Sequence, residues 1–278
     1  MIENNSNNNT NSNNNTNTNN TNTNNTNTNS NTNNDNNTNK FKGKLFGIGV
    51  GPGDTELLTL KAVRILNDVD VICAPRASEK QDSTALNIIK PILKERRKDL
   101  TIFDPVFPML EDESLLNSYW NDATSLIISK LDEGLDVAFI TLGDPSIYST
   151  FSYIQKKIQK NQEYYEIEMV PGITSFTSCA ASINKPLVEK DEVLSIVPKI
   201  QDNFNGFIDN SDTIVLMKLS RNKEKINEIK KDIDDLNGNI FTIKNSSKKN
   251  EEIINDFSFD KTYFMTSIVK LNKKINED

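Results

Sequence analysis

The feature that constrains the fold most is the alternation of short, continuous apolar runs with helical patterns. Apolar runs occupy residues 69–74 and 137–142, and a run interrupted by glycines occupies residues 44–50. Strands that are apolar on both faces are typical of parallel sheets, because helices cover both sides of such sheets. Helical patterns lie between these runs, at 56–67 and 116–131. The first half of the chain therefore predicts an α/β fold with a mostly parallel sheet.

The second half predicts a different arrangement of strands. Two strands near its end, at 240–243 and 263–269, have no helical pattern between them, which indicates a mixed sheet. A polar stretch at 157–163 is the predicted boundary, giving domains 41–160 and 161–278. The other predicted elements of this half are strands at 167–170, 193–197 and 213–217 and helices at 173–183 and 222–236.

Residues 1–40 do not belong to either predicted domain. From Ile2 to Asn39 almost every position is Asn, Thr or Ser, without apolar periodicity. Such a tract cannot bury enough surface to offset the entropy lost on ordering, so we expect a disordered tail. It also lacks the basic start and apolar core of a secretory signal.

Composition excludes several classes of function. The net charge of −7 argues against nucleic acid or an anionic membrane as the main partner, and no apolar run is long enough to span a membrane. The two cysteines, Cys73 and Cys179, lack paired spacing and are expected to be reduced core residues of a cytoplasmic protein. The chain has no histidine, which excludes His-based catalytic triads and makes a protein-bound metal improbable.

A glycine-rich loop, GIGVGPGD at 47–54, follows the first apolar run. It fits neither common nucleotide fingerprint: a G-x-G-x-x-G motif would need glycine at Pro52 or Asp54, and no Gly-Lys-Ser/Thr ending follows. A carboxylate at this turn would repel phosphate and suits a ligand with positive charge. Alternatively, the loop is only a tight turn that needs glycine, with Asp54 as a helix N-cap.

Two further loops share the character of the first. The sequence LGDPSIY at 142–148 follows a buried strand, and VPGITS at 170–175 leads into a helix. In a parallel sheet such loops lie at the carboxyl ends of the strands, where open α/β sheets bind ligands. We therefore expect the three loops to form one ligand site.

Together, the stretches GVGPGDTELLTLKA, LGDPSIYST and VPGITS resemble the tetrapyrrole methylase family, which transfers methyl groups from S-adenosylmethionine to corrinoid and sirohaem precursors. The segments PRASEKQDSTALNIIKPI and YFMTSIVK are most similar to the branch that methylates C-20 of precorrin-2 or cobalt-factor II in cobalamin synthesis. The resemblance covers residues 44–270. It implies two α/β/α domains with the active-site cleft between them, a homodimer, and a tetrapyrrole as the small-molecule substrate.

The resemblance also assigns residues to the methyl donor. Asp144 is the best candidate for the counter-charge to the donor's ammonium and sulfonium groups, unless it only caps the helix that follows. The donor-binding residues implied are Pro52, Leu142, Gly143, Asp144, Ile147, Thr174, Ser175 and Met217.

The acceptor and the proton transfer require other residues. The acceptor is a macrocycle edged by carboxylates, so its site needs cations. Arg76 follows the second strand, at the same sheet end as the donor loops, and Lys185 follows the third-loop helix. C-20 loses a proton after methylation, and the base is Asp54, Tyr148 or water. No metal ligands are needed, because any cobalt arrives within the substrate.

Three alternatives remain open. The same fold could methylate uroporphyrinogen III, a later precorrin or a modified histidine of an elongation factor. A nucleotide-dependent oxidoreductase on a doubly wound sheet is disfavoured by the failed fingerprint and by the Pro75–Arg76 ending of the second strand. A binding protein that kept the fold without turnover is the third.

Overall fold

The first sheet has five parallel strands in the order β3-β2-β4-β1-β5. The computed structural model describes residues 41–96, 98–108, 112–160, 164–200, 204–217, 223–259 and 264–273, and the predicted tail at 1–40 lies outside them. The predicted parallel sheet is confirmed. Its strands are β1 Leu45–Gly49, β2 Val71–Cys73, β3 Thr101–Phe103, β4 Val137–Thr141 and β5 Ile167–Val170.

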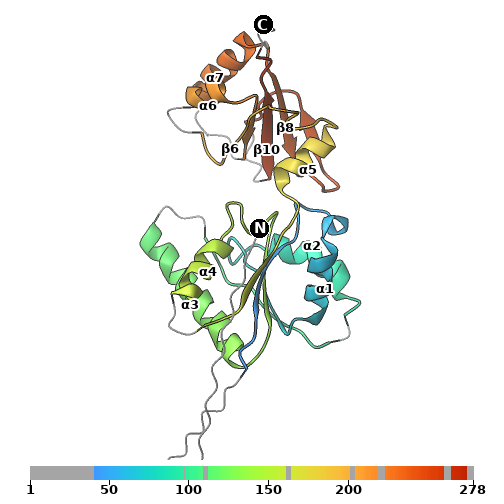
Figure 1. The fold of residues 1–278 in the computed structure, drawn as a ribbon, viewed down its shortest axis with the longest axis vertical. Helices are drawn as coiled ribbons and strands as arrows, with labels where there is room; N and C mark the ends of the chain where they lie inside the picture. The colour runs from blue at the N-terminus through green and yellow to red at the C-terminus, as the bar shows by residue number, and fades with distance from the viewer. Residues whose placement is uncertain are drawn as a thin grey trace, which may run out of the picture. The chain divides into compact units, whose positions relative to one another are not determined.

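Helices cover both faces of this sheet, as its apolar strands require. On one face pack α1 (Leu60–Asp68) and α2 (Thr84–Leu93), through residues such as Leu66 and Ile89. On the other face pack α3 (Glu113–Asp132) and α4 (Phe151–Gln159), through Ile127 and Ile154 among others (Figure 1).

The first helix begins later than the pattern predicted. Residues Thr55–Leu57 form a single 3-10 turn, and α1 starts only after Thr59, whose side chain accepts a hydrogen bond from the N–H of Ala62. A threonine N-cap fixes the start of the helix at this point. The α2 helix contains Pro91 and ends two residues after it.

The second sheet is mixed, with the order β6-β7-β10-β8-β9. Only β6 and β7 are parallel, and the other neighbours are antiparallel, which confirms the mixed sheet. One face carries α5 (Ser175–Ser182), and the other carries α6 (Asn205–Asn210) and α7 (Lys223–Asp235). The strands are β6 Leu194–Val197, β7 Thr213–Leu216, β8 Asn239–Lys244, β9 Glu252–Ile254 and β10 Met265–Lys270.

The strand at Ile167–Val170 corrects one detail of the predicted organisation. A boundary at 157–163 assigns this strand to the second domain, whereas it pairs with β1 at the edge of the first sheet. Lys157 lies in the last turn of α4, residues 161–163 lie outside the described residues, and the chain passes to the second sheet only after Val170. The division into two domains itself stays a prediction. Within the residues described, no helix is both long enough and apolar enough to cross a lipid bilayer.

Glycines allow the three loops at the carboxyl edge of the first sheet to touch. Gly51 and Gly143 exchange two backbone hydrogen bonds, with N···O distances of 3.3 and 2.9 Å. A Cβ atom on Gly172 would lie 2.1 Å from the carbonyl oxygen of Gly143, and one on Gly49 would lie 2.5 Å from the same oxygen. A side chain at either position would force the loops apart, because protein interiors have no room for such overlap.

This packing makes Gly172→Ala a test of the loop arrangement. We expect the free energy of unfolding to fall by about 1–3 kcal/mol, because the added carbon overlaps backbone atoms. The matched control is Gly206→Ala in α6, where an added Cβ meets nothing within 4 Å and the unfolded chain loses entropy. Urea unfolding of both variants provides the measurement. Equal stability of the two variants would contradict the close approach of the loops.

Candidate active site

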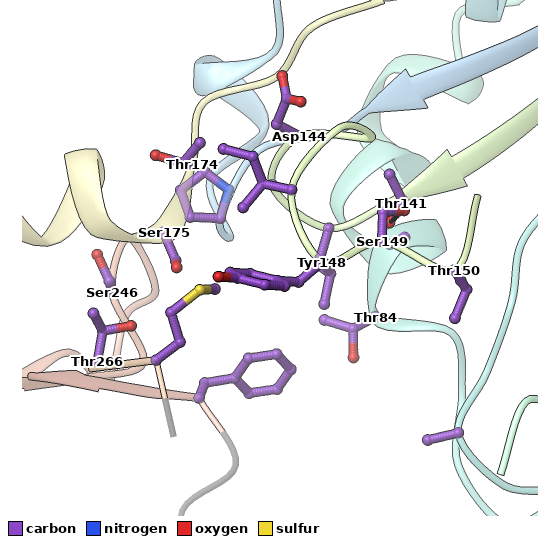
Figure 2. Close-up of a pocket in the computed structure, with 18 of the residues that line it drawn as sticks. Thr84, Thr141, Asp144, Tyr148, Ser149, Thr150, Thr174, Ser175, Ser246 and Thr266 are labelled. Atoms are coloured by element: carbon purple, nitrogen blue, oxygen red, sulfur yellow. Dashed lines mark hydrogen bonds between the residues drawn. The ribbon is translucent and has the colours of Figure 1, made fainter. Parts of the chain in front are cut away.

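A cavity of about 1190 Å³ opens at the carboxyl edge of the first sheet. Its wall combines the loops after β1, β2, β4 and β5 with residues from the second sheet, among them Met217, Ile243 and Thr266. Figure 2 shows side chains that line it, several of them Ser and Thr hydroxyls. A cavity of this size that brings polar groups together on an apolar wall is typical of a small-molecule site.

The first glycine-rich loop contributes Pro52 to the cavity wall. Asp54, two residues later, does not line the cavity. Its carboxylate accepts a hydrogen bond of 2.9 Å from the N–H of Glu56 and caps the 3-10 turn Thr55–Leu57. The structure therefore gives Asp54 the N-cap contact that was one of its two interpretations.

The second loop contributes Leu142, Gly143, Asp144 and Ile147, all four of the residues predicted for it. Gly143 has a φ of +65°, which a residue with a side chain rarely adopts. The sharp turn that follows β4 therefore depends on this glycine.

Asp144 ties the second loop to the third. One carboxylate oxygen accepts from the N–H of Ser146 at 2.8 Å and from its hydroxyl, and the other accepts from the N–H of Gly172 at 3.0 Å. Burial alone would raise the pKa of Asp144, but the hydrogen bonds from Ser146 and Gly172 outweigh it and hold the pKa below its ordinary value. The carboxylate points away from the ring of Tyr148 (Figure 2), so it is a loop-positioning group and a fixed negative charge.

The third loop and the second sheet complete the predicted donor residues. Thr174 is the N-cap of α5, its side chain accepting from the N–H of Thr177, and Ser175 begins that helix. Both line the cavity, as does Met217, which directly follows β7. All eight residues predicted for the donor thus line the same cavity, although their contacts with a donor stay a prediction.

Tyr148 extends into the cavity from the second loop. Its backbone φ is +49°, and its side chain is 61% exposed. Its hydroxyl donates a hydrogen bond to the carbonyl oxygen of Ile196 in β6, at an O···O distance of 3.3 Å. Figure 2 places the ring in the middle of the view, between the labelled Thr174 and Thr84.

The two predicted acceptor cations have different positions. Arg76 lines the cavity, and its Nε contacts the Asp104 carboxylate at 3.2 Å while Nη1 donates to the carbonyl of Glu79 at 3.0 Å. Lys185 does not line the cavity; its ammonium lies 5.6 Å from the centre of the Phe241 ring. The structure therefore brings only Arg76 to the predicted donor residues.

Sequence reasoning missed several residues of this wall. Lys80 and Lys199 add two cations, and Ser246, Phe264 and Thr266 come from the second sheet. Lys80 could have been found, because it lies in the same loop as Arg76. The other four depend on how the second sheet's strands pair, which no local sequence pattern shows.

Comparison with solved structures defines the class of protein. A cobalt-precorrin-4 methyltransferase matches with a TM-score of 0.59 at 17% identity, covering 82% of this chain and 94% of that chain. A uroporphyrin-III C-methyltransferase from Thermus thermophilus, solved with S-adenosylhomocysteine, matches with a TM-score of 0.53 at 16% identity, covering 82% of this chain and 97% of that one. The fold is that of the tetrapyrrole methyltransferases.

Sequence comparison identifies the family. Residues 44–258 match the family described as Tetrapyrrole (Corrin/Porphyrin) Methylases, and the chain belongs to it. A probable cobalt-precorrin-2 C(20)-methyltransferase of Methanocaldococcus jannaschii is 37% identical over 80% of this chain and 94% of its own length. A cobalt-precorrin-2 C(20)-methyltransferase of Salmonella typhimurium is 31% identical over 60% of this chain and 69% of its own length.

The contacts of Asp144 lead to a prediction for donor binding. We expect Asp144→Ala to weaken the binding of S-adenosylhomocysteine about tenfold or more, because a charged hydrogen-bond acceptor is lost and two loops are released. Calorimetric titration measures this affinity, with Asp122→Ala on the exposed face of α3 as the control. Unchanged affinity in Asp144→Ala would contradict the role.

The same carboxylate gives a pH dependence with a defined sign. Because the pKa of Asp144 is lowered on folding, its stabilising contribution is present above the ordinary value of 3.8 and is lost as the pH falls below it. The difference in unfolding free energy between the natural chain and Asp144→Ala should therefore be constant near neutral pH and shrink in acid. Urea unfolding at several pH values measures it.

Proposed function

We propose that the chain transfers a methyl group from S-adenosylmethionine to C-20 of precorrin-2 or cobalt-factor II in cobalamin biosynthesis. The observation that carries this proposal is the 37% identity to a probable cobalt-precorrin-2 C(20)-methyltransferase across 94% of that protein. The 31% identical relative from Salmonella typhimurium has the same activity in its name. Relatives that act on uroporphyrinogen III are less similar, at 28% identity over 63% of the chain.

The cavity wall fits the methyl donor. Gly143 presents backbone and not a side chain to the cavity, and Pro52 and Met217 supply apolar surface. When bound, the donor supplies an already activated methyl group on a sulfonium. The protein's task is then to orient the two reactants and exclude water, which needs no nucleophilic side chain. The fixed charge of Asp144 favours a cationic donor at this wall.

The acceptor, whose edge carries carboxylates, requires positively charged side chains. Arg76, Lys80 and Lys199 line the cavity, the first two from the loop after β2 and the third from the segment after β6. Cations from two sides of the cavity can bind carboxylates at separate edges of one macrocycle. Cobalt, where present, is part of this substrate.

The proton that leaves C-20 needs an acceptor. Asp54 caps a turn outside the cavity lining, and the Tyr148 hydroxyl donates a hydrogen bond to the Ile196 carbonyl. We therefore propose that water, the third candidate, takes this proton. A homodimer and a cytoplasmic location complete the proposal, the second supported by Cys73 and Cys179, which are buried free thiols.

An anaerobic assay with S-adenosylmethionine tests the substrate. Metal-free precorrin-2, cobalt-factor II and uroporphyrinogen III are offered separately, and mass spectrometry counts the methyl groups added. We expect one methyl group on precorrin-2 or cobalt-factor II and none on uroporphyrinogen III. Turnover of uroporphyrinogen III alone would overturn the C-20 assignment while leaving the family intact.

Arg76→Ala tests the acceptor end of the cavity. We expect the KM for the tetrapyrrole to rise about tenfold and the KM for the donor to change little, because a charge-assisted contact to a carboxylate is lost. Arg64→Ala on the exposed face of α1 is the matched control and should leave both KM values unchanged. An equal rise in both KM values for Arg76→Ala would contradict a position at the acceptor.

A further inference from the structure

The backbone of Tyr148 is held in an unfavourable conformation. Its φ of +49° lies in the left-handed region, which costs a bulky residue of the order of 1 kcal/mol or more. The surrounding loop fixes it from both sides. On the N-terminal side of Tyr148, the Asp144 carboxylate accepts hydrogen bonds from the N–H groups of Ser146 and Gly172. On its C-terminal side, the Ser149 hydroxyl donates to the Thr141 hydroxyl at 2.9 Å.

The hydroxyl of Tyr148 meets an edge of the second sheet. The carbonyl of Val197 points toward β7, where it accepts a hydrogen bond from the N–H of Met217. Carbonyls alternate in direction along a strand, so the carbonyl of Ile196 points away from β7. Because β6 is the outer strand of its sheet, no strand among the described residues pairs with that outer edge. The Tyr148 hydroxyl donates to it at 3.3 Å, and the side chain therefore spans the cavity from a first-sheet loop to the second sheet.

The ring itself remains open to a ligand. Tyr148 lines the cavity and is 61% exposed as a residue, and most of the surface of a tyrosine side chain belongs to its ring, so the ring is accessible to a ligand. In Figure 2 the ring lies between Thr174, at the donor loops, and Thr84, which lies at the start of α2 after the loop of Arg76 and Lys80. A fixed aromatic ring at this place can pack against a flat, conjugated ligand with little further loss of entropy.

We propose that Tyr148 is a positioning and specificity residue for the acceptor. Its ring forms a wall on which the conjugated macrocycle packs, and its bond to Ile196 sets the angle of that wall toward the donor. This inference rests on the proposed function only in that the acceptor is a flat tetrapyrrole. It explains why an exposed tyrosine is kept at a positive φ.

Two variants separate the ring from the hydroxyl. Tyr148→Leu removes the ring, and Tyr148→Phe keeps it and removes the contact with Ile196. We expect the Kd for cobalt-factor II, from absorbance titration, to rise about three- to tenfold in Tyr148→Leu and less in Tyr148→Phe. The Kd for S-adenosylhomocysteine, from calorimetry, should stay within about twofold in both variants.

The control and the contrary outcomes are defined by the same titrations. Tyr164→Leu removes a tyrosine that is 85% exposed outside the cavity lining and should change neither Kd. An unchanged Kd for cobalt-factor II in Tyr148→Leu would overturn the inference, and so would an equal loss of both ligands. If the natural chain binds neither cobalt-factor II nor precorrin-2, the proposed function is overturned first.

Discussion

The contact of three glycine backbones at the carboxyl edge of the first sheet is the constraint on which the rest of the site depends. Gly49 ends β1, and Gly143 and Gly172 follow its neighbours β4 and β5. A Cβ atom on Gly49 or Gly172 would overlap the carbonyl oxygen of Gly143, and Gly143 itself has a φ of +65°. Because the loops meet backbone to backbone, Pro52, Ile147 and Thr174 line the same cavity although they are far apart in the sequence.

Polar contacts then join this edge to the second sheet. The Asp144 carboxylate holds the loop that leads into α5, and the Ser178 hydroxyl of α5 bonds to the Ser246 hydroxyl after β8 at 2.9 Å. Glu251 accepts from the Ser182 hydroxyl and from the N–H of Ser247, at 2.9 and 2.7 Å. The Ser178–Ser246 bond is buried, and a satisfied buried hydrogen bond restricts geometry more than an apolar contact does. The α5 helix thus connects the glycine loops to the second sheet and fixes one relative to the other.

The sequence predicted the elements whose position depends on local residue patterns. It missed features that depend on which strands pair with one another. The apolar runs and the glycine turns located β1, β4 and their loops, because burial on both faces and tight turns each leave a local pattern. The sheet membership of β5 was wrong, since a strand of four residues looks the same in either sheet. Lys199 and Thr266 were missed because they reach the cavity only through the order β6-β7-β10. Asp144 was found from its motif, but its bond to Gly172 required coordinates.

The distribution of charge within the cavity follows from this arrangement. The chain as a whole is acidic, with a net charge of −7, yet the loop after β2 and the segment after β6 place Arg76, Lys80 and Lys199 at the cavity. The glycine loops contribute Asp144, and none of the three cations comes from them. A ligand with positive charge and one with negative charge would therefore be attracted to different residues of the same cavity. Because Tyr148 is held at its backbone by the second loop and at its hydroxyl by β6, this one fixed side chain can limit how the two oppositely charged reactants meet.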